Sequence, residues 1–143
     1  MELSQFLFYL LLSLAPGMLA AQNKAEALRQ DSTLKFPQLT FVAQQYDFGE
    51  IRKGEKITTS FYFKNTGTKP LYLLQVQTSC GCTATNWSRE AVAPNAVGEI
   101  TVIYDSAAQE NQEGPQEKAL LVISNALNKE VILLLKGKIL KPD

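Results

Sequence analysis

Alternating apolar and polar side chains are clearest between residues 57 and 64 of the chain. One set of alternate positions is mainly apolar and the other mainly polar: Ile57, Thr59, Phe61 and Phe63 against Thr58, Ser60, Tyr62 and Lys64. A period of two residues is typical of a β-strand that has one buried face. We therefore predict a strand here, with the side chains of Phe61 and Phe63 in the core.

Other apolar stretches, separated by turn residues, also predict strands. They are Leu39–Tyr46, Leu71–Thr78, Thr83–Trp87, the segment around Ile100–Tyr104, Glu117–Ser124 and Lys129–Leu140. Phe48–Ile51 predicts a bend, and Asn65–Pro70 predicts a turn. About seven antiparallel strands without a convincing helix predict an all-β fold, an immunoglobulin-like β-sandwich.

The same reasoning assigns further side chains to the core. Tyr46, Phe48 and Trp87 are aromatic residues of a β-domain, where such side chains are more often buried than exposed. Alternation continued beyond the strand that ends at Thr78 places two cysteines, Cys80 and Cys82, on the face of Leu74, Val76 and Thr78. We expect that face to point toward the core.

The N-terminal stretch has the features of a secretory leader. Phe6–Leu14 is apolar, Pro16 and Gly17 follow it, and the small residues Ala20 and Ala21 offer a cleavage site. The expected organisation is a signal peptide over residues 1–21, a polar linker over 22–38 and one sandwich domain over 39–143. Because no cysteine follows the apolar run to carry a lipid, we expect a periplasmic or secreted protein without membrane insertion. An uncleaved anchor is the alternative.

Charge and composition narrow the function classes. The chain has 14 basic and 14 acidic side chains, scattered along its length, so no basic patch for nucleic acid is predicted. It contains no histidine, which excludes Ser-His and Cys-His nucleophilic systems and histidine-liganded zinc. We therefore expect a protein that is not an enzyme and needs no cofactor.

Cys80 and Cys82 are the candidate chemical site, with three interpretations. They could be small core side chains, a disulfide of redox function, or two thiolate ligands for Cu(I). A regular strand separates such residues by roughly 6.6 Å at their Cα atoms, so a disulfide needs the chain to bend at Gly81. The loop that the disulfide would close is very short, so the bond would add little to the stability of the fold.

A longer pattern surrounds these cysteines and resembles one known family. Its elements are Tyr46–Ile51, Lys53–Glu55, Phe61–Gly67, Lys69–Leu71, Ser79–Thr83, Val92–Pro94, Gly98–Ile100, Ser124–Asn125 and Leu135–Lys138. This combination looks like the bacterial DUF1573 family, a relative of ASH and MSP-like immunoglobulin-type domains. The most specific part is Cys80 and Cys82 with the motif residues Ser79, Gly81 and Thr83. The resemblance implies a fold and a compartment rather than a reaction.

Two functional hypotheses follow from different classes. The first is an exported, non-enzymatic module that binds another envelope or secreted protein, or serves as a structural adaptor, through sheet edges and loops. The second is a thiol-redox or Cu(I)-handling protein that acts through Cys80 and Cys82. Accessibility of the two sulfur atoms discriminates between them, because only the second needs reactive thiols.

Overall fold

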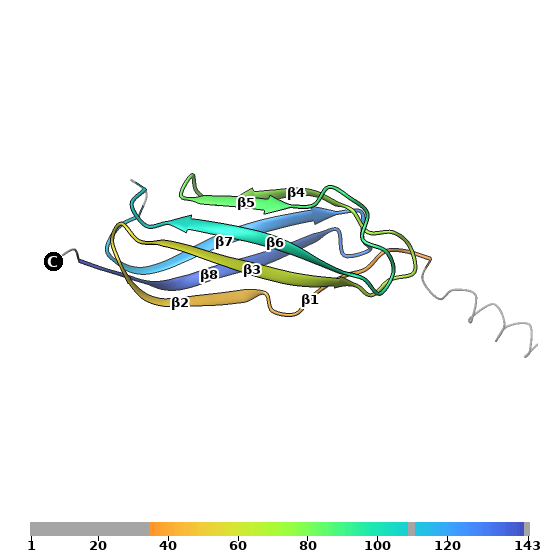
Figure 1. Ribbon diagram of the computed structural model, residues 1–143, viewed down its shortest axis with the longest axis horizontal. Coiled ribbons are helices and arrows are strands. Elements are labelled where there is room, and N and C mark those ends of the chain that lie inside the picture. Colours follow the sequence, from red (N-terminus) through yellow and green to blue (C-terminus); the bar gives the residue numbers. More distant parts are fainter. Residues whose placement is uncertain (1–34, 109–110, 142–143) are drawn as a thin grey trace, which may run out of the picture. The chain divides into compact units, whose positions relative to one another are not determined.

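A computed structural model of the chain describes residues 35–108 and 111–141 (Figure 1). The described residues form eight strands and no helix, which confirms the all-β class. The strands are β1 (Leu39–Phe41), β2 (Gln45–Arg52), β3 (Lys56–Asn65), β4 (Leu73–Thr78), β5 (Thr83–Trp87), β6 (Val97–Asp105), β7 (Gly114–Ser124) and β8 (Glu130–Leu140). The predicted leader and linker residues 22–34 lie outside the described residues. No described segment is a helix long and apolar enough to cross a membrane.

Two four-stranded sheets pack face to face as a β-sandwich. Sheet A has the strand order β1-β3-β6-β5 and sheet B the order β2-β8-β7-β4, and Figure 1 shows the two layers. The predicted first strand is in fact two strands, because the chain crosses from sheet A to sheet B between Phe41 and Gln45. The structure thus has eight strands where about seven were predicted, and one pair, β2 with β8, is parallel.

The core confirms the predicted face of the clearest strand. Phe61 and Phe63 are 3% and 2% exposed, and Phe61 lies opposite the fully buried Ile100 of β6. Sheet B contributes buried aliphatic side chains from both long strands of its hairpin: Leu120, Val122, Leu133, Leu135 and Ile139. Alternation in each sheet thus supplies one wall of a single core.

The observed core differs from the predicted one near the two irregular pairings of sheet B, although Phe48 still packs against it. Phe48 lies within β2 rather than in a bend, is half-buried, and stacks on Tyr104 with ring centroids 5.2 Å apart. Tyr46 is 38% exposed. Pairing of β4 with β7 shifts between Leu73 and Gln75, so Leu73 is buried and Leu74 is 57% exposed. A bulge of this kind moves side chains to the opposite face.

Asn65, at the end of β3, joins several loops with its side-chain amide. Its Oδ1 atom accepts hydrogen bonds from the backbone N–H groups of Gly67 (3.0 Å) and Gln38 (3.3 Å). Its Nδ2 atom donates to the carbonyl oxygens of Lys69 (2.7 Å) and Val92 (2.9 Å). The side chain is fully buried. Sequence reasoning treats this residue as the start of a turn and does not show its central role.

Residues at the end of the predicted linker already bond to the sandwich. The carbonyl oxygen of Phe36 accepts from Thr68 N–H at 3.0 Å, and that of Pro37 accepts from Leu127 N–H, also at 3.0 Å. Pro37 is buried. These residues therefore belong structurally with the domain.

Candidate functional site

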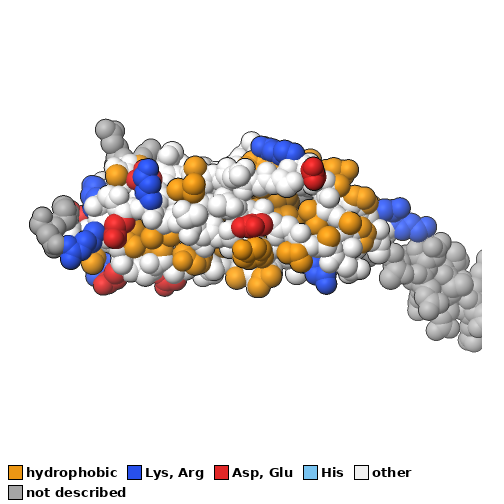
Figure 2. All heavy atoms as spheres, viewed as in Figure 1, with side chains coloured by type: hydrophobic (Ala, Val, Ile, Leu, Met, Phe, Trp, Pro, Cys, Tyr) orange, Lys and Arg blue, Asp and Glu red, His pale blue; other side chains and the backbone are white. Residues whose placement is uncertain are grey.

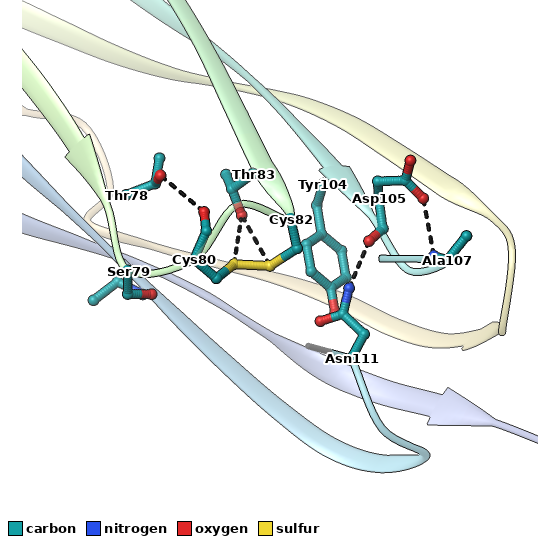
Figure 3. The surroundings of a disulfide bond; sticks show 10 residues. Thr78, Ser79, Cys80, Cys82, Thr83, Tyr104, Asp105, Ala107 and Asn111 are labelled. Carbon is teal, nitrogen blue, oxygen red and sulfur yellow. Dashed lines mark hydrogen bonds between the residues drawn. A yellow bond between two sulfur atoms is a disulfide. The ribbon is translucent and has the colours of Figure 1, made fainter. Parts of the chain in front are cut away.

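The two cysteines form a disulfide in the turn between β4 and β5. Their Cα atoms are 5.2 Å apart, closer than in a regular strand, because the chain bends between them (Figure 3). In this structure the two cysteines are therefore oxidised to a disulfide rather than present as free thiols. Gly81 occupies the tip of the bend and is exposed.

The disulfide is buried unequally at its two ends. Cys82 is 2% exposed and belongs to the core, whereas Cys80 is only partly buried. Thr83, itself buried, places its hydroxyl oxygen 3.6 Å from Cys80 Sγ and 3.8 Å from Cys82 Sγ. An incoming thiol would therefore approach the sulfur of Cys80 more readily than that of Cys82.

Neighbouring hydrogen bonds fix the turn to both sheets. Ser79 donates its backbone N–H to the carbonyl oxygen of Ala119 at 3.0 Å, and its hydroxyl accepts from Ala119 N–H at 3.1 Å. On the other side, the carbonyl oxygen of Cys82 accepts from Asp105 N–H at 2.8 Å. The motif residues Ser79 and Thr83 thus have structural contacts that hold the disulfide between β7 and β6.

A polar chain beside the disulfide comes from residues that sequence reasoning did not select. The buried hydroxyl of Tyr104 donates to Asn111 Oδ1 at 2.9 Å, and Asn111 Nδ2 bonds to the carbonyl oxygen of Asp105 (Figure 3). Burial raises the pKa of Tyr104, so the phenol keeps the proton that it donates. Asn111 lies in the polar loop after β6. The composition of this loop gives no sign that the side chain of Asn111 is buried.

Asp105, whose backbone carbonyl ends this series of hydrogen bonds, also has a charged side chain. Its carboxylate accepts from the backbone N–H of Ala107 at 2.9 Å and forms an ion pair with Lys56 at 3.2 Å. The hydrogen bond from Ala107, followed by that from Lys56, lowers the pKa of the carboxyl group. Asp105 is therefore an ionised structural group rather than a proton donor at neutral pH. In the described ranges, no three His, Cys, Asp or Glu side chains are placed to share a metal ion.

The outer face of sheet B next to the disulfide turn is apolar. Leu121 of β7 lies opposite Ile132 of β8, and Ala119 lies opposite Leu134, all directed away from the core. Ile132 is 57% exposed. These side chains, which we call the outer apolar face, adjoin a shallow depression of about 240 Å³ lined by Gln77, Thr78, Ser79, Ala119, Leu121 and Ile132. Aliphatic side chains in this position are a departure from the usual polar outer face of an antiparallel sheet.

A second apolar area lies near the junction of β1 and β2. Val42, Tyr46 and Tyr62 are exposed there and line a small cleft of about 90 Å³. Figure 2 shows hydrophobic side chains gathered along this part of the surface. Tyrosine side chains combine an apolar ring with a hydroxyl, which suits them to protein contacts.

Residues 39–139 match the sequence model of a family described as "Protein of unknown function (DUF1573)". No curated protein matches the chain at a significant level.

Solved structures share the fold at low sequence identity. A protein of unknown function from Porphyromonas gingivalis W83 is 17% identical with a TM-score of 0.64, and the match covers 75% of this chain and 49% of that one. The chain thus spans about half the length of that structure. The ASH/PapD-like domain 7 of human CEP192 is 8% identical with a TM-score of 0.60, covering 76% of this chain and 89% of that one.

The periplasmic chaperone SfaE shows the same architecture more distantly. It is 11% identical with a TM-score of 0.50, and the match covers 73% of this chain and 58% of the chaperone. All three likenesses concern the sandwich, because identities this low are informative about the fold alone.

Proposed function

Because this chain belongs to the DUF1573 family, whose model covers residues 39–139, we propose that it is an exported, non-enzymatic adaptor. It binds another envelope or secreted protein through the surface of its sandwich. The observation that carries this proposal is the outer apolar face, where Leu121 and Ile132 lie side by side on the solvent side of sheet B. Apolar patches on a sheet surface usually mark an interaction site.

Three further observations support the proposal. A structural disulfide is stable in oxidising compartments, so the Cys80–Cys82 bond is compatible with export. SfaE, a periplasmic chaperone by name, shows that this fold occurs in an exported protein. The absence of histidine from the sequence removes the commonest general base, which favours binding over catalysis.

One observation favours a second candidate function, thiol–disulfide exchange. Cys80 is only partly buried whereas Cys82 is 2% exposed, so an external thiolate can approach the disulfide from the side of Cys80. Exchange would begin when an external thiolate attacks Cys80 Sγ, forms a mixed disulfide and releases Cys82 as a thiolate. A second external thiol would complete a two-electron reduction. Cu(I) binding would require this reduction first, because the oxidised pair has no thiolate to donate.

Export is expected to remove the leader and release a protein whose first residue is close to Gln22. N-terminal sequencing of the protein recovered from the periplasmic or secreted fraction checks this expectation. Material that stays in the membrane with Met1 intact would contradict the exported form of the proposal and favour the anchored one.

Binding through the outer apolar face is expected to depend on Ile132 and not on the cysteines. A photo-crosslinking amino acid at Ala119, beside Ile132 on this face, should capture the envelope partner in living cells. Adding Ile132→Lys should abolish the crosslink, because it introduces a charge into the apolar contact, yet change stability by no more than about 0.5 kcal/mol. Replacing Cys80 and Cys82 with serine should preserve the crosslink after any loss of stability is corrected.

The matched control places the same crosslinker at Thr58, on the outer face of sheet A, where no capture of that partner is expected. If Ile132→Lys leaves capture unchanged, the outer apolar face does not bind the partner. If instead the cysteine variant stays folded but loses capture, or the wild-type pair cycles reversibly with an external dithiol, the exchange function replaces the adaptor.

A further inference from the structure

The free edge of sheet A has a defined hydrogen-bonding pattern. Strand β5 is the last strand of that sheet and pairs only with β6 among the described strands. The backbone N–H of Asp105 donates to Cys82, which makes these two residues a hydrogen-bonded pair. Bonded and non-bonded pairs alternate in an antiparallel ladder. Thr83, Thr85 and Trp87 therefore direct their backbone N–H and C=O groups away from β6, toward the open edge.

The other edges of the sandwich carry features that block strand addition. β1 has three residues, and the pairing of β4 shifts at Leu74. β2 has a similar irregularity and carries the charged side chains Asp47, Glu50 and Arg52. Short length, bulges and charges are the usual protections of an edge strand. β5 has neither a bulge in its pairing nor any charge, proline or glycine.

We propose that β5 pairs antiparallel with β5 of a second copy of this chain, with Thr85 opposite Thr85. This register is self-complementary because the outward-directed residues are spaced evenly around Thr85, so that Thr83 of each copy meets Trp87 of the other. On the outer face the same register places Ala84 opposite Asn86. These side chains are small and uncharged, so neither bulk nor like charges oppose the pairing.

The end of β5 offers a further reason for the second copy. Trp87 is only half-buried, and Arg89 lies over its ring at 3.8 Å from the centroid. A neighbouring strand covers the remaining surface of Trp87 and extends sheet A across the two-fold axis. The contact is small, so the dimer forms at high concentration rather than being permanent.

The first test compares the purified wild-type protein with Thr85→Pro by sedimentation velocity over a range of concentrations. Proline removes the N–H group at the centre of the proposed pairing, but within one copy that group does not bond to β6. We expect concentration-dependent dimerisation of the wild type and its loss in Thr85→Pro, with the association constant reduced at least about tenfold. Thr85→Val keeps the N–H group and should dimerise as the wild type does. Equal melting temperatures of the three proteins would show that the monomer is intact.

A charge exchange tests the register. Ala84→Lys with Asn86→Lys places like charges opposite each other twice, whereas Ala84→Lys with Asn86→Glu places opposite charges there. The first variant should weaken the dimer and the second should restore or strengthen it, at low salt in particular. Should Thr85→Pro prove unfolded, this pair of variants still tests the proposal.

Two results would overturn the inference. A wild-type protein that stays monomeric up to about 1 mM would leave no role for the β5 edge in self-association. Association that responds to Ile132→Lys but not to the β5 variants would place the contact on the outer apolar face. The inference does not rest on the proposed adaptor function, because β5 belongs to sheet A and Ala119 to sheet B, so the β5 variants are expected to leave the partner crosslink at Ala119 unchanged.

Discussion

Phe61→Ala is expected to unfold the sandwich or to lower its free energy of unfolding by about 3 to 5 kcal/mol. The side chain is 3% exposed and packs in the core from the centre of β3, opposite the fully buried Ile100. Truncation removes the ring and leaves a cavity that two paired sheets cannot close without losing their register. Chemical denaturation followed by circular dichroism measures the loss.

The control for this experiment is Thr58→Ala, three positions away in the same strand and on its exposed face. Its expected effect is within about 0.5 kcal/mol, because a surface threonine loses little on truncation. Equal losses in the two variants would show that the assignment of the buried face of β3 is wrong.

Asn65→Asp is expected to destabilise the fold by roughly 3 kcal/mol or more, although the two side chains have nearly the same shape. The Nδ2 atom donates to the carbonyl oxygens of Lys69 and Val92, and a carboxylate oxygen in its place would repel both. The buried carboxylate therefore has a raised pKa in the folded state. Its neutral form is tolerated better, so the loss of stability should shrink as the pH falls and grow as the pH rises through that pKa.

Denaturation curves of Asn65→Asp at several acidic and neutral pH values check this expectation. Asn86→Asp supplies a matched control, because Asn86 is exposed on β5 and its substitution adds the same charge. A neutral-pH stability of Asn65→Asp close to that of Asn86→Asp would mean that the amide does not hold the loops as the structure indicates.

The fold could be predicted wherever local alternation coincides with regular pairing. Phe61 and Phe63 alternate with polar residues, and the hairpin of β7 and β8 follows from two apolar runs around a short turn. The division of the first strand could not be predicted, because a crossing between sheets leaves the alternating pattern nearly unchanged. The exposure of Leu74 could not be predicted for a related reason. The shift in pairing depends on the partner strand and does not follow from the local sequence.

The position of the candidate site could be predicted from the sequence, but the bonding of its two cysteines and the identity of their neighbours could not. The spacing of Cys80 and Cys82 allows both a strand and a bend, and only the bend brings the sulfur atoms together. The neighbours of the pair come from β6 and the loop after it, far along the chain, so Tyr104 and Asn111 show no common pattern. Ser79 and Thr83 were found only through the resemblance to a family, because their contacts with Ala119 and the sulfur atoms are tertiary.

The parallel pairing of β2 with β8 affects the order in which the chain can fold. Gln45 lies opposite Leu134, and Arg52 lies opposite Leu140, at the two ends of the domain sequence. A chain emerges from the ribosome with its N-terminus first. β2 therefore stays unpaired until β8, the last strand, has been synthesised. Closing so long a loop is slow compared with forming a hairpin. Until β8 arrives, the edges of β2 and β7 that it will cover are both open to other chains, and this is the interval in which the protein is most open to misassembly.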